Sequence, residues 1–339
     1  MRTLRGIAPA VSEALDQEMA NNPEVFVLGD DVSHWGARFG FTGGLQEKYG
    51  RGRVIDAPAG GQNVLGLAAG AATTGLRPVV ALISGDFLGT GFDQIYDHIA
   101  TVNYLSGGQV RMPVTIVVAV GGGYGGGAQL SQMRYGLFAH APGVKVVVPS
   151  TAYDAKGLTT TALADPNPVI IFGHRLLTGQ PGVPFEGEDE DVPEDPYSIP
   201  FGLAAVRREG SDVTIVATAA TVRRSVRAAA HLAEYDISAE VVDVRTLVPL
   251  DTDTIVASAR KTGRVLVVDE DYQSFGTTGE LTFRIQAGAF DRLTAPVRRV
   301  AVPDVPIPYS EPLEQAVIPN VERIFDEARS LAGVSARAS

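Results

Sequence analysis

Two uncharged, strand-like runs on either side of a glycine-rich loop constrain the fold of this chain more than any other feature. The first run, Pro113–Val120, leads into the loop Gly121–Gly127, and the second, Val144–Val148, leads into a helix start at Pro149–Gly157. Uncharged β-branched runs are typical of strands that are buried on both faces of a parallel sheet. Ligands bind such sheets at the carboxyl edge, in the loops that follow the strands. We therefore expect the chemistry of this protein to lie on the glycine-rich loop.

Strand-like and helix-like segments alternate through the first half of the chain. The predicted strands are Val25–Gly29, Val79–Ile83, Val114–Val120, Val144–Val148 and Val169–Phe172. Helical patterns cover residues 10–21, 61–75, 91–105 and 153–164. In the pattern 91–105, the apolar residues Phe92, Ile95, Ile99 and Val102 share one face of the helix. This alternation predicts an α/β fold with a doubly wound parallel sheet.

A second, smaller α/β domain is predicted after an acidic, proline-rich segment. The segment Gln180–Pro200 shows neither helical nor strand periodicity, which is typical of a hydrated, extended connector. Beyond it we predict strands at Val213–Ala217, Ala239–Val244, Val265–Val268 and Val297–Val302, and helices at 221–234, 252–261, 277–289 and 319–332. We therefore expect domains at residues 1–185 and 201–333, a linker at 186–200 and a frayed tail at 334–339.

Net charge and composition indicate which kinds of partner and which cellular location to expect. The net charge of -11 and the pI near 5.0 argue against nucleic acid or an anionic membrane as the main partner, because both bind clustered Lys and Arg. The absence of cysteine excludes disulfides, thiolate nucleophiles and cysteine-ligated metals. The first residues lack a secretory signal pattern, and the long uncharged stretches are rich in Gly and Ala rather than Leu and Ile. We expect a cytoplasmic protein with no membrane or nucleic-acid partner.

The glycine-rich loop and the histidines admit more than one interpretation. Gly121, Gly123 and Gly126 match the G-x-G-x-x-G pattern of dinucleotide-binding folds, but a run so rich in glycine matches such patterns by chance. A loop beside a ligand or a subunit interface is the favoured interpretation. No two of the 5 histidines have the spacing of a helical metal site. His140, at the predicted sheet edge, is placed for proton transfer or phosphate contact, and a structural role is the alternative.

Motifs spread along the chain carry a resemblance to a known family. They are Val25–Val32, Gly75–Val80, Asp86-Phe87 with Phe92–Gln94, Ser106–Gln109, Phe138–Gly143, Pro149–Gly157, Arg245–Asp251 and Pro303–Tyr309. Over nearly its whole length the chain resembles the β subunit of the thiamine-diphosphate-dependent decarboxylase component of 2-oxo acid dehydrogenase complexes. The pyruvate, branched-chain and acetoin types all fit, and all belong to the transketolase superfamily.

The resemblance implies a pyrimidine-binding domain for residues 1–185 and a transketolase-type C-terminal domain after the linker. It also implies an α subunit partner, a heterotetramer of two α and two β chains with a β–β contact, and a lipoyl acyltransferase core. In this family a Gly-Asp-Gly motif of the α subunit holds the diphosphate and its magnesium, and Gly85–Phe87 is not that motif. This chain alone is therefore expected to bind thiamine diphosphate poorly and to be inactive.

The resemblance places the coenzyme pocket at Gly61, Gln62, Ser84, Asp86, Phe87 and Leu130. Three of these positions depart from the family pattern. Gly61 stands where the family has an activating glutamate that hydrogen-bonds a ring nitrogen of the aminopyrimidine. Ser84 replaces a phenylalanine, and Leu130 replaces a histidine implicated in acyl transfer to lipoyl, so lipoyl acylation is in doubt. Gln62 cannot ionise, and it faces elsewhere if residues 61–75 are helical.

A possible structural cation is also implied by the resemblance. Ala162, Asp165 and Asn167 match a family loop whose backbone carbonyls hold a potassium ion. A helix-capping turn is the alternative explanation of the same residues.

Three functions remain open at this point. The leading hypothesis is the β half of a thiamine-diphosphate-dependent 2-oxo acid dehydrogenase-like enzyme, with His140 as the catalytic residue. The second is a diverged carboligase or transketolase-like enzyme without a lipoyl acceptor, which Gly61 and Leu130 motivate. The third is a non-catalytic scaffold or regulatory subunit with an altered pocket.

Overall fold

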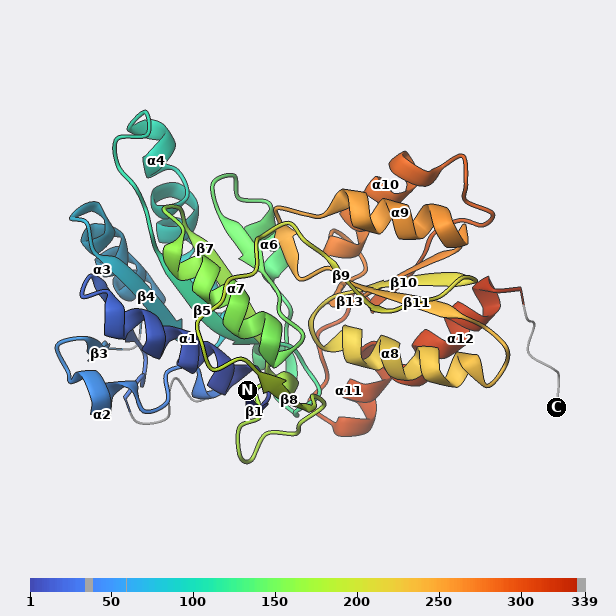
Figure 1. Cartoon of the computed structure of the whole chain (residues 1–339), viewed down its shortest axis with the longest axis horizontal. Helices are drawn as coiled ribbons and strands as arrows, with labels where there is room; N and C mark the ends of the chain where they lie inside the picture. Colours follow the sequence, from blue (N-terminus) through green and yellow to red (C-terminus); the bar gives the residue numbers. More distant parts are fainter. Residues whose placement is uncertain (34–38, 59, 334–339) are drawn as a thin grey trace.

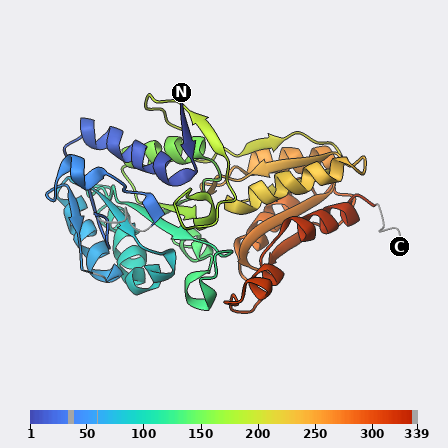
Figure 2. The same ribbon diagram turned by 90° about the horizontal axis from the view of Figure 1, so that it is seen from below.

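The chain forms two halves, each built around its own β-sheet, in a computed structural model that describes residues 1–33, 39–58 and 60–333. Figures 1 and 2 view the molecule from directions at right angles, and both show the halves side by side along the long axis. The predicted α/β class with parallel sheets is confirmed. The tail expected at 334–339 lies outside the described residues.

The sheet of the N-terminal half has seven strands in the order β12-β6-β7-β5-β4-β2-β3. The strands are β2 (Val25–Gly29), β3 (Val54–Asp56), β4 (Arg77–Leu82), β5 (Thr115–Val120), β6 (Lys145–Val147), β7 (Val169–His174) and β12 (Thr246–Val248). Neighbouring strands are parallel except for β12, which comes from the C-terminal half and pairs antiparallel with β6. Every residue of β5 and β7 is buried, as expected for central strands covered on both faces.

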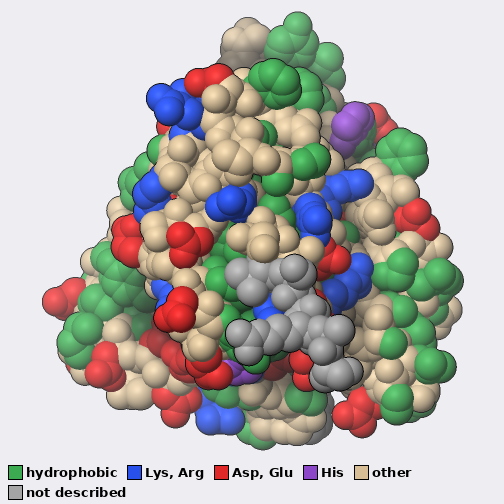
Figure 3. Space-filling model, turned by 90° about the vertical axis from the view of Figure 1, so that its right-hand side faces the viewer, with side chains coloured by type: hydrophobic (Ala, Val, Ile, Leu, Met, Phe, Trp, Pro, Cys, Tyr) green, Lys and Arg blue, Asp and Glu red, His purple; other side chains and the backbone are tan. Residues whose placement is uncertain are grey.

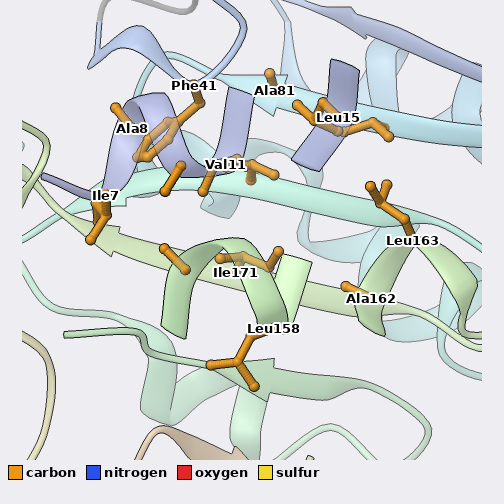
Figure 4. Packing of buried hydrophobic residues seen from close by; sticks show 14 of the residues in the cluster. Ile7, Ala8, Val11, Leu15, Phe41, Ala81, Leu158, Ala162, Leu163 and Ile171 are labelled. Carbon is orange, nitrogen blue, oxygen red and sulfur yellow. The ribbon is translucent and has the colours of Figure 1, made fainter. Parts of the chain in front are cut away.

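Helices cover both faces of this sheet. They are α1 (Ile7–Asn21), α2 (Leu45–Tyr49), α3 (Gly61–Thr73), α4 (Val102–Leu105), α5 (Gly127–Leu130), α6 (Tyr135–Ala139) and α7 (Ala152–Ala164), with the short helical turns η2 (Gly85–Gly91), η3 (Gln94–Ile99) and η4 (Arg175–Leu177). On one face, Val11 and Leu15 of α1 share a buried cluster with Leu158 of α7 and Ile171 of β7 (Figure 4). Helix α3 packs on the opposite face, so the sheet is doubly wound as predicted.

The segment 91–105, predicted as one amphipathic helix, is divided into three pieces. η3 is a π-helix, in which the amide of Ala100 bonds to the carbonyl of Ile95, five residues earlier. This wider turn shifts the residues that follow around the helix axis, which a pattern of 3.6 residues per turn does not foresee. Ile95 and Ile99 are nevertheless buried together, so the predicted apolar face is retained.

The five-stranded sheet of the C-terminal half has the order β14-β13-β10-β11-β9. Its strands are β9 (Ala205–Arg208), β10 (Val213–Ala217), β11 (Ala239–Asp243), β13 (Val265–Tyr272) and β14 (Arg298–Val302). Its helices are α8 (Ala219–Ala233), α9 (Thr252–Thr262), α10 (Thr277–Ala289), α11 (Glu311–Val317) and α12 (Val321–Leu331). Helices α8 and α12 cover one face, and α9 and α10 cover the other.

The acidic segment expected as an extended connector contains a strand. β8 (Asp189–Val192) pairs antiparallel with β1 (Arg2–Arg5) in a separate two-stranded sheet. Val192 is buried, and Arg223 of α8 forms ion pairs with Glu188 and Glu190. The acidic side chains therefore connect this segment to the C-terminal half. The sequence pattern did not predict β8 because its partner, β1, lies at the start of the chain.

None of the helices within the described ranges is long and apolar enough to span a membrane. Figure 3 shows the end of the C-terminal half, where basic and acidic side chains are interspersed.

Candidate functional site

A fully buried arginine joins three segments at the carboxyl edge of the N-terminal sheet. Arg175 follows β7 and donates from Nη1 to the carbonyl oxygen of Gly121 and from Nη2 to Oδ2 of Asp86, both at 2.8 Å. The Ser84 hydroxyl donates to the same Asp86 oxygen at 2.6 Å. All these polar side chains are buried, and buried charges need such partners. The structure therefore brings two predicted pocket residues, Ser84 and Asp86, into one network.

The second carboxylate oxygen of Asp86 contacts the segment that follows the glycine-rich loop. Asp86 Oδ1 accepts from the backbone amide of Gln132 at 3.3 Å and lies 3.8 Å from Nε of Arg134. The carbonyl oxygen of Leu130, two residues earlier, accepts from the Tyr124 hydroxyl at 2.5 Å. Backbone contacts therefore hold this segment, and the side chain at position 130 has no group that could transfer a proton.

Two carboxylates of the C-terminal half hold the glycine-rich loop. Glu314, on α11, accepts from the amides of Gly123 and Gly125 at 2.9 and 3.0 Å. Glu270, on β13, accepts from the amide of Gly122 at 3.1 Å. Both glutamates are buried, so the loop connects the two halves of the chain through charge-assisted hydrogen bonds.

Glu270 is also the centre of a buried ion-pair network. Burial alone would raise the pKa of Glu270, but His174 at 2.6 Å and Arg224 at 3.1 Å lower that pKa to about 2. Gly121 lies against this network with a φ of +94°, and a Cβ atom at position 121 would overlap the imidazole ring of His174. Glycine is therefore required here by both backbone conformation and space.

His140 lines two cavities between the halves of the chain. The larger cavity, of about 580 Å³, is also lined by Phe92, Tyr96, Gln132 and Asp271. The smaller cavity, of about 310 Å³, shares His140 and is bounded by residues of β12 and α10. The His140 side chain is exposed, and its Nδ1 atom lies 3.0 Å from the Tyr96 hydroxyl, which orients the ring. This geometry allows proton transfer at the cavity, and the catalytic role of His140 stays a prediction.

Asp271 lies at the wall of the larger cavity, with the fully buried Asp269 behind it. Burial and the nearby charge of Asp269 raise the pKa of Asp271 to about 7, so this carboxyl group can exchange a proton near neutral pH. Asp269 is fully buried and accepts hydrogen bonds from the hydroxyl groups of Tyr135 and Thr277. The Asp271 carboxylate also accepts from the amides of Tyr272 and Thr277, which fixes its position.

Gly61 begins α3 beside η2, and the neighbouring residue Gln62 is exposed. A Cβ atom at position 61 would lie 2.7 Å from the Thr90 hydroxyl and 3.3 Å from the carbonyl oxygen of Phe87. The Phe87 side chain is 47% exposed. Gly61 is therefore buried against the backbone of η2, whose Phe87 side chain is exposed, while His140 lines the cavities between the halves.

The residues of the expected potassium site form a capped helix end. The carbonyl of Ala162 accepts from the Asp165 amide at 3.2 Å, and the Asn167 amide donates to the Asp165 carboxylate at 2.9 Å. The carbonyl of Asp165 accepts from the guanidinium of Arg77 at 2.8 Å, and Lys145 forms an ion pair with its carboxylate. Two positive side chains already neutralise this turn, so the contacts fit the capping alternative better than a potassium ion.

The sequence analysis did not predict four residues of this site. Three of them stand in a sequence pattern that could have indicated a functional position. Arg175 follows a long uncharged strand, which is where parallel sheets place functional side chains. Glu270 and Asp271 belong to an acidic run at the end of another uncharged strand. Glu314 left none, because one acid in a short, polar helix normally faces solvent.

Each half of the chain matches a protein-family model. Residues 6–180 match the model described as "Transketolase, pyrimidine binding domain". Residues 202–324 match the model described as "Transketolase, C-terminal domain".

Comparison with individual proteins identifies relatives over nearly the full chain. The acetoin:2,6-dichlorophenolindophenol oxidoreductase subunit beta of Cupriavidus necator is 42% identical over 330 residues, which cover 94% of this chain and 95% of the relative. The pyruvate dehydrogenase E1 component subunit beta of Bacillus subtilis is 40% identical over 322 residues, with coverage of 95% and 97%. Among solved structures, an inactive β4 tetramer of a split-gene transketolase has a TM-score of 0.77 and 26% identity, with coverage of 97% and 99%.

Proposed function

This chain belongs to the family of transketolase-type β subunits, and we propose that it is the β subunit of a thiamine-diphosphate-dependent 2-oxo acid dehydrogenase-like enzyme that works with an α subunit. The carrying observation is the similarity over at least 94% of the chain to β subunits named for acetoin and pyruvate oxidation. The resemblance seen in the sequence motifs is thereby confirmed. The split-gene transketolase, inactive as a β4 tetramer, supports our expectation that this chain alone has no activity.

The described residues fit the pyrimidine end of thiamine diphosphate. The half-exposed Phe87 side chain lies on η2, whose backbone packs against Gly61 at the start of α3. An exposed aromatic ring of this kind can stack on a flat aromatic ring. Among the described residues, no group of three acidic or histidine side chains could hold a metal ion. We infer that the α subunit supplies the ligands of the magnesium and the diphosphate. A potassium ion held by the backbone carbonyls of Ala162, Asp165 and Asn167 stays a prediction.

The bound coenzyme would supply the carbon nucleophile that attacks a carbonyl group. This chain contributes groups that bind, orient and exchange protons. The Asp86–Arg175 network holds Ser84 and the backbone of Gln132 in place. His140, oriented by Tyr96, would exchange protons with a substrate in the cavity. We infer that the cavity admits a small 2-oxo acid or a hydroxyketone such as acetoin.

We infer an assembly of two α and two β chains because the resemblance implies it, and the large apolar side chains that both halves expose support contacts with other chains. They include Leu67, Phe87, Tyr104, Leu105, Phe275, Phe283, Phe290 and Tyr309. Exposed apolar surface of this extent is typical of protein–protein contacts. A cytoplasmic location stays a prediction from the sequence.

A second candidate function is carboligation or ketol transfer without a lipoyl acceptor. The observation that favours it is Leu130, whose side chain cannot act as the acid or base that the resemblance places there. Acylation of a lipoyl domain distinguishes the two candidates. A complex that acylates the domain at a rate similar to its rate with an artificial electron acceptor excludes the second one.

The test is turnover by the complex of this chain with its α subunit. The complex, loaded with thiamine diphosphate and magnesium, is assayed with pyruvate, branched 2-oxo acids and acetoin, using 2,6-dichlorophenolindophenol as the electron acceptor. We expect turnover with at least one substrate, and His140→Ala to reduce it by about 10²–10⁴-fold. A correctly assembled, coenzyme-loaded complex without turnover on any of them contradicts the proposed function.

A further inference from the structure

We propose that Asp30 supplies the carboxyl group that contacts the aminopyrimidine ring nitrogen of the coenzyme, in place of the side chain that Gly61 lacks. The inference rests on the proposed function and names a catalytic residue for it. The observations that carry it are the burial of Asp30, its position beside α3, and its incomplete hydrogen bonding.

Asp30 has a buried carboxylate oxygen that no described residue contacts through a hydrogen bond. The residue is 8% exposed, and its Oδ1 atom has no hydrogen-bond partner among the described residues. The backbone amide of Gly60 lies near this carboxyl group and lowers its pKa, against the larger effect of burial, which raises that pKa. Buried polar atoms are nearly always hydrogen-bonded, so an unpaired carboxylate oxygen indicates a missing ligand or a functional role.

The sheet places Asp30 directly beside the start of α3. It follows β2, whose last residue, Gly29, pairs with Asp56 of β3 and Ala81 of β4. Leu28 of β2 belongs to the same buried cluster as Leu65 of α3 and Leu88 of η2, so the end of β2 lies near these two elements. The effect of the Gly60 amide on the pKa of Asp30 places the carboxylate near the residue that precedes Gly61.

Two other acidic groups at this edge, Asp56 and Asp86, already have partners. The Asp56 carboxylate accepts from the amide and hydroxyl groups of Ser33, and the Asp86 carboxylate is bound to Arg175. Gln62 is exposed and cannot ionise. Within the described part of the chain, Asp30 therefore has a buried carboxylate oxygen available for a ligand near Gly61.

The protonation state of Asp30 suits this role. Burial raises the pKa of Asp30, and the Gly60 amide only partly offsets this effect. A carboxyl group with a raised pKa is more readily protonated, and the protonated group can donate a hydrogen bond to a ring nitrogen. The structure also explains why position 61 could lose its acid: the Thr90 hydroxyl occupies the space next to it.

The test compares Asp30→Asn with wild type in the assembled α/β complex loaded with thiamine diphosphate and magnesium. Two quantities are measured: the rate at which the C2 proton of the bound coenzyme exchanges with deuterium oxide, and the dissociation constant of the coenzyme. We expect Asp30→Asn to slow the exchange by about 10²–10⁴-fold, because a positioned acid is lost. The dissociation constant should change by less than about tenfold, the effect of roughly one neutral hydrogen bond.

Asp31→Asn is the matched control, because Asp31 has a φ of +54°, which asparagine tolerates, and the substitution removes the same charge one residue away. Exchange in this control should equal that of wild type. Asp30→Ala provides a second test, in which added formate should restore the exchange rate if a carboxyl group is what the site lacks.

The outcomes separate this inference from the proposed function. A wild-type complex that binds no thiamine diphosphate overturns the proposed function and the inference with it. A wild-type complex that binds the coenzyme and exchanges its proton, with Asp30→Asn exchanging equally fast, overturns the inference alone. Slow exchange in Asp30→Ala that formate does not restore assigns Asp30 a structural role and also overturns it.

Discussion

Replacing Glu314 by glutamine tests whether the carboxylate of α11 holds the glycine-rich loop. The carboxylate accepts from the amides of Gly123 and Gly125 and from the Ser131 hydroxyl. Glutamine keeps one oxygen, but its NH₂ group would face a backbone amide that then has no acceptor. A bond to a charged group contributes about 1.5–3 kcal/mol, and an unpaired buried donor costs about 1–3 kcal/mol. We therefore expect the loop to be destabilised by about 3 kcal/mol.

Hydrogen exchange of the full-length chain, followed by mass spectrometry of peptides that span residues 121–132, measures this effect. A loss of about 3 kcal/mol corresponds to roughly 100-fold faster exchange of the loop amides. Glu311→Gln is the control, because Glu311 is exposed on the same helix and its replacement should change stability by less than about 0.5 kcal/mol. Equal exchange in Glu314→Gln and Glu311→Gln would refute the assignment of Glu314 as the residue that holds the loop.

Three further substitutions test other parts of the structure. Gly121→Ala should lower the free energy of unfolding, measured with denaturant, by more than about 3 kcal/mol, because the added Cβ atom overlaps a buried histidine. Gly125→Ala is the control: position 125 also has a positive φ but open space around it, so this substitution should cost only about 1–2 kcal/mol. Burial and a neighbouring carboxylate raise the pKa of Asp271 from 3.8 to about 7, so between these pH values the folded state binds a proton that the unfolded state has lost. The free energy of unfolding of wild type should therefore fall as the pH rises from about 4 to about 7, and Asp271→Asn should show a smaller fall. Gly61→Glu should lower the melting temperature through contact with the Thr90 hydroxyl, at a cost of about 1–3 kcal/mol, and adding Thr90→Ala should recover part of it; equal melting temperatures of the single and double variants would exclude that contact.

Local periodicity predicted much of the architecture because the sheets are parallel and buried. The runs Val25–Gly29 and Val213–Ala217 are strands with the predicted bounds, and helix 277–289 also agrees. The strands β1, β3, β8, β9 and β12 were missed. They are short, and several depend on a partner that is distant in sequence: β12 pairs with β6 of the other half, and β8 with β1. Pairing of this kind is set by tertiary contacts rather than by propensity.

The candidate site could be predicted only where a residue type stands out at a strand end. Ser84 and Asp86 follow β4, and the structure joins them through Arg175. The contribution of Glu314 could not be foreseen, because it depends on how the two halves dock. The role we assign to Asp30 depends on an unpaired buried oxygen, which only coordinates can show. The sequence pattern predicted which edge of the sheet holds the site. Tertiary packing determines which acidic side chains at that edge have an oxygen free to bind a ligand.

Calorimetric titration of thiamine diphosphate, with magnesium present, most directly tests whether this chain supplies half of a shared coenzyme pocket. The titration is carried out on this chain, on its α subunit and on the complex of the two. We expect the complex to bind one coenzyme for each α–β pair, and each separate chain to bind at least about 100-fold more weakly, because about 3 kcal/mol of contacts is missing. Binding by this chain alone with the affinity of the complex, or no binding by a correctly assembled complex, would contradict the claim that this chain supplies half of a shared coenzyme pocket.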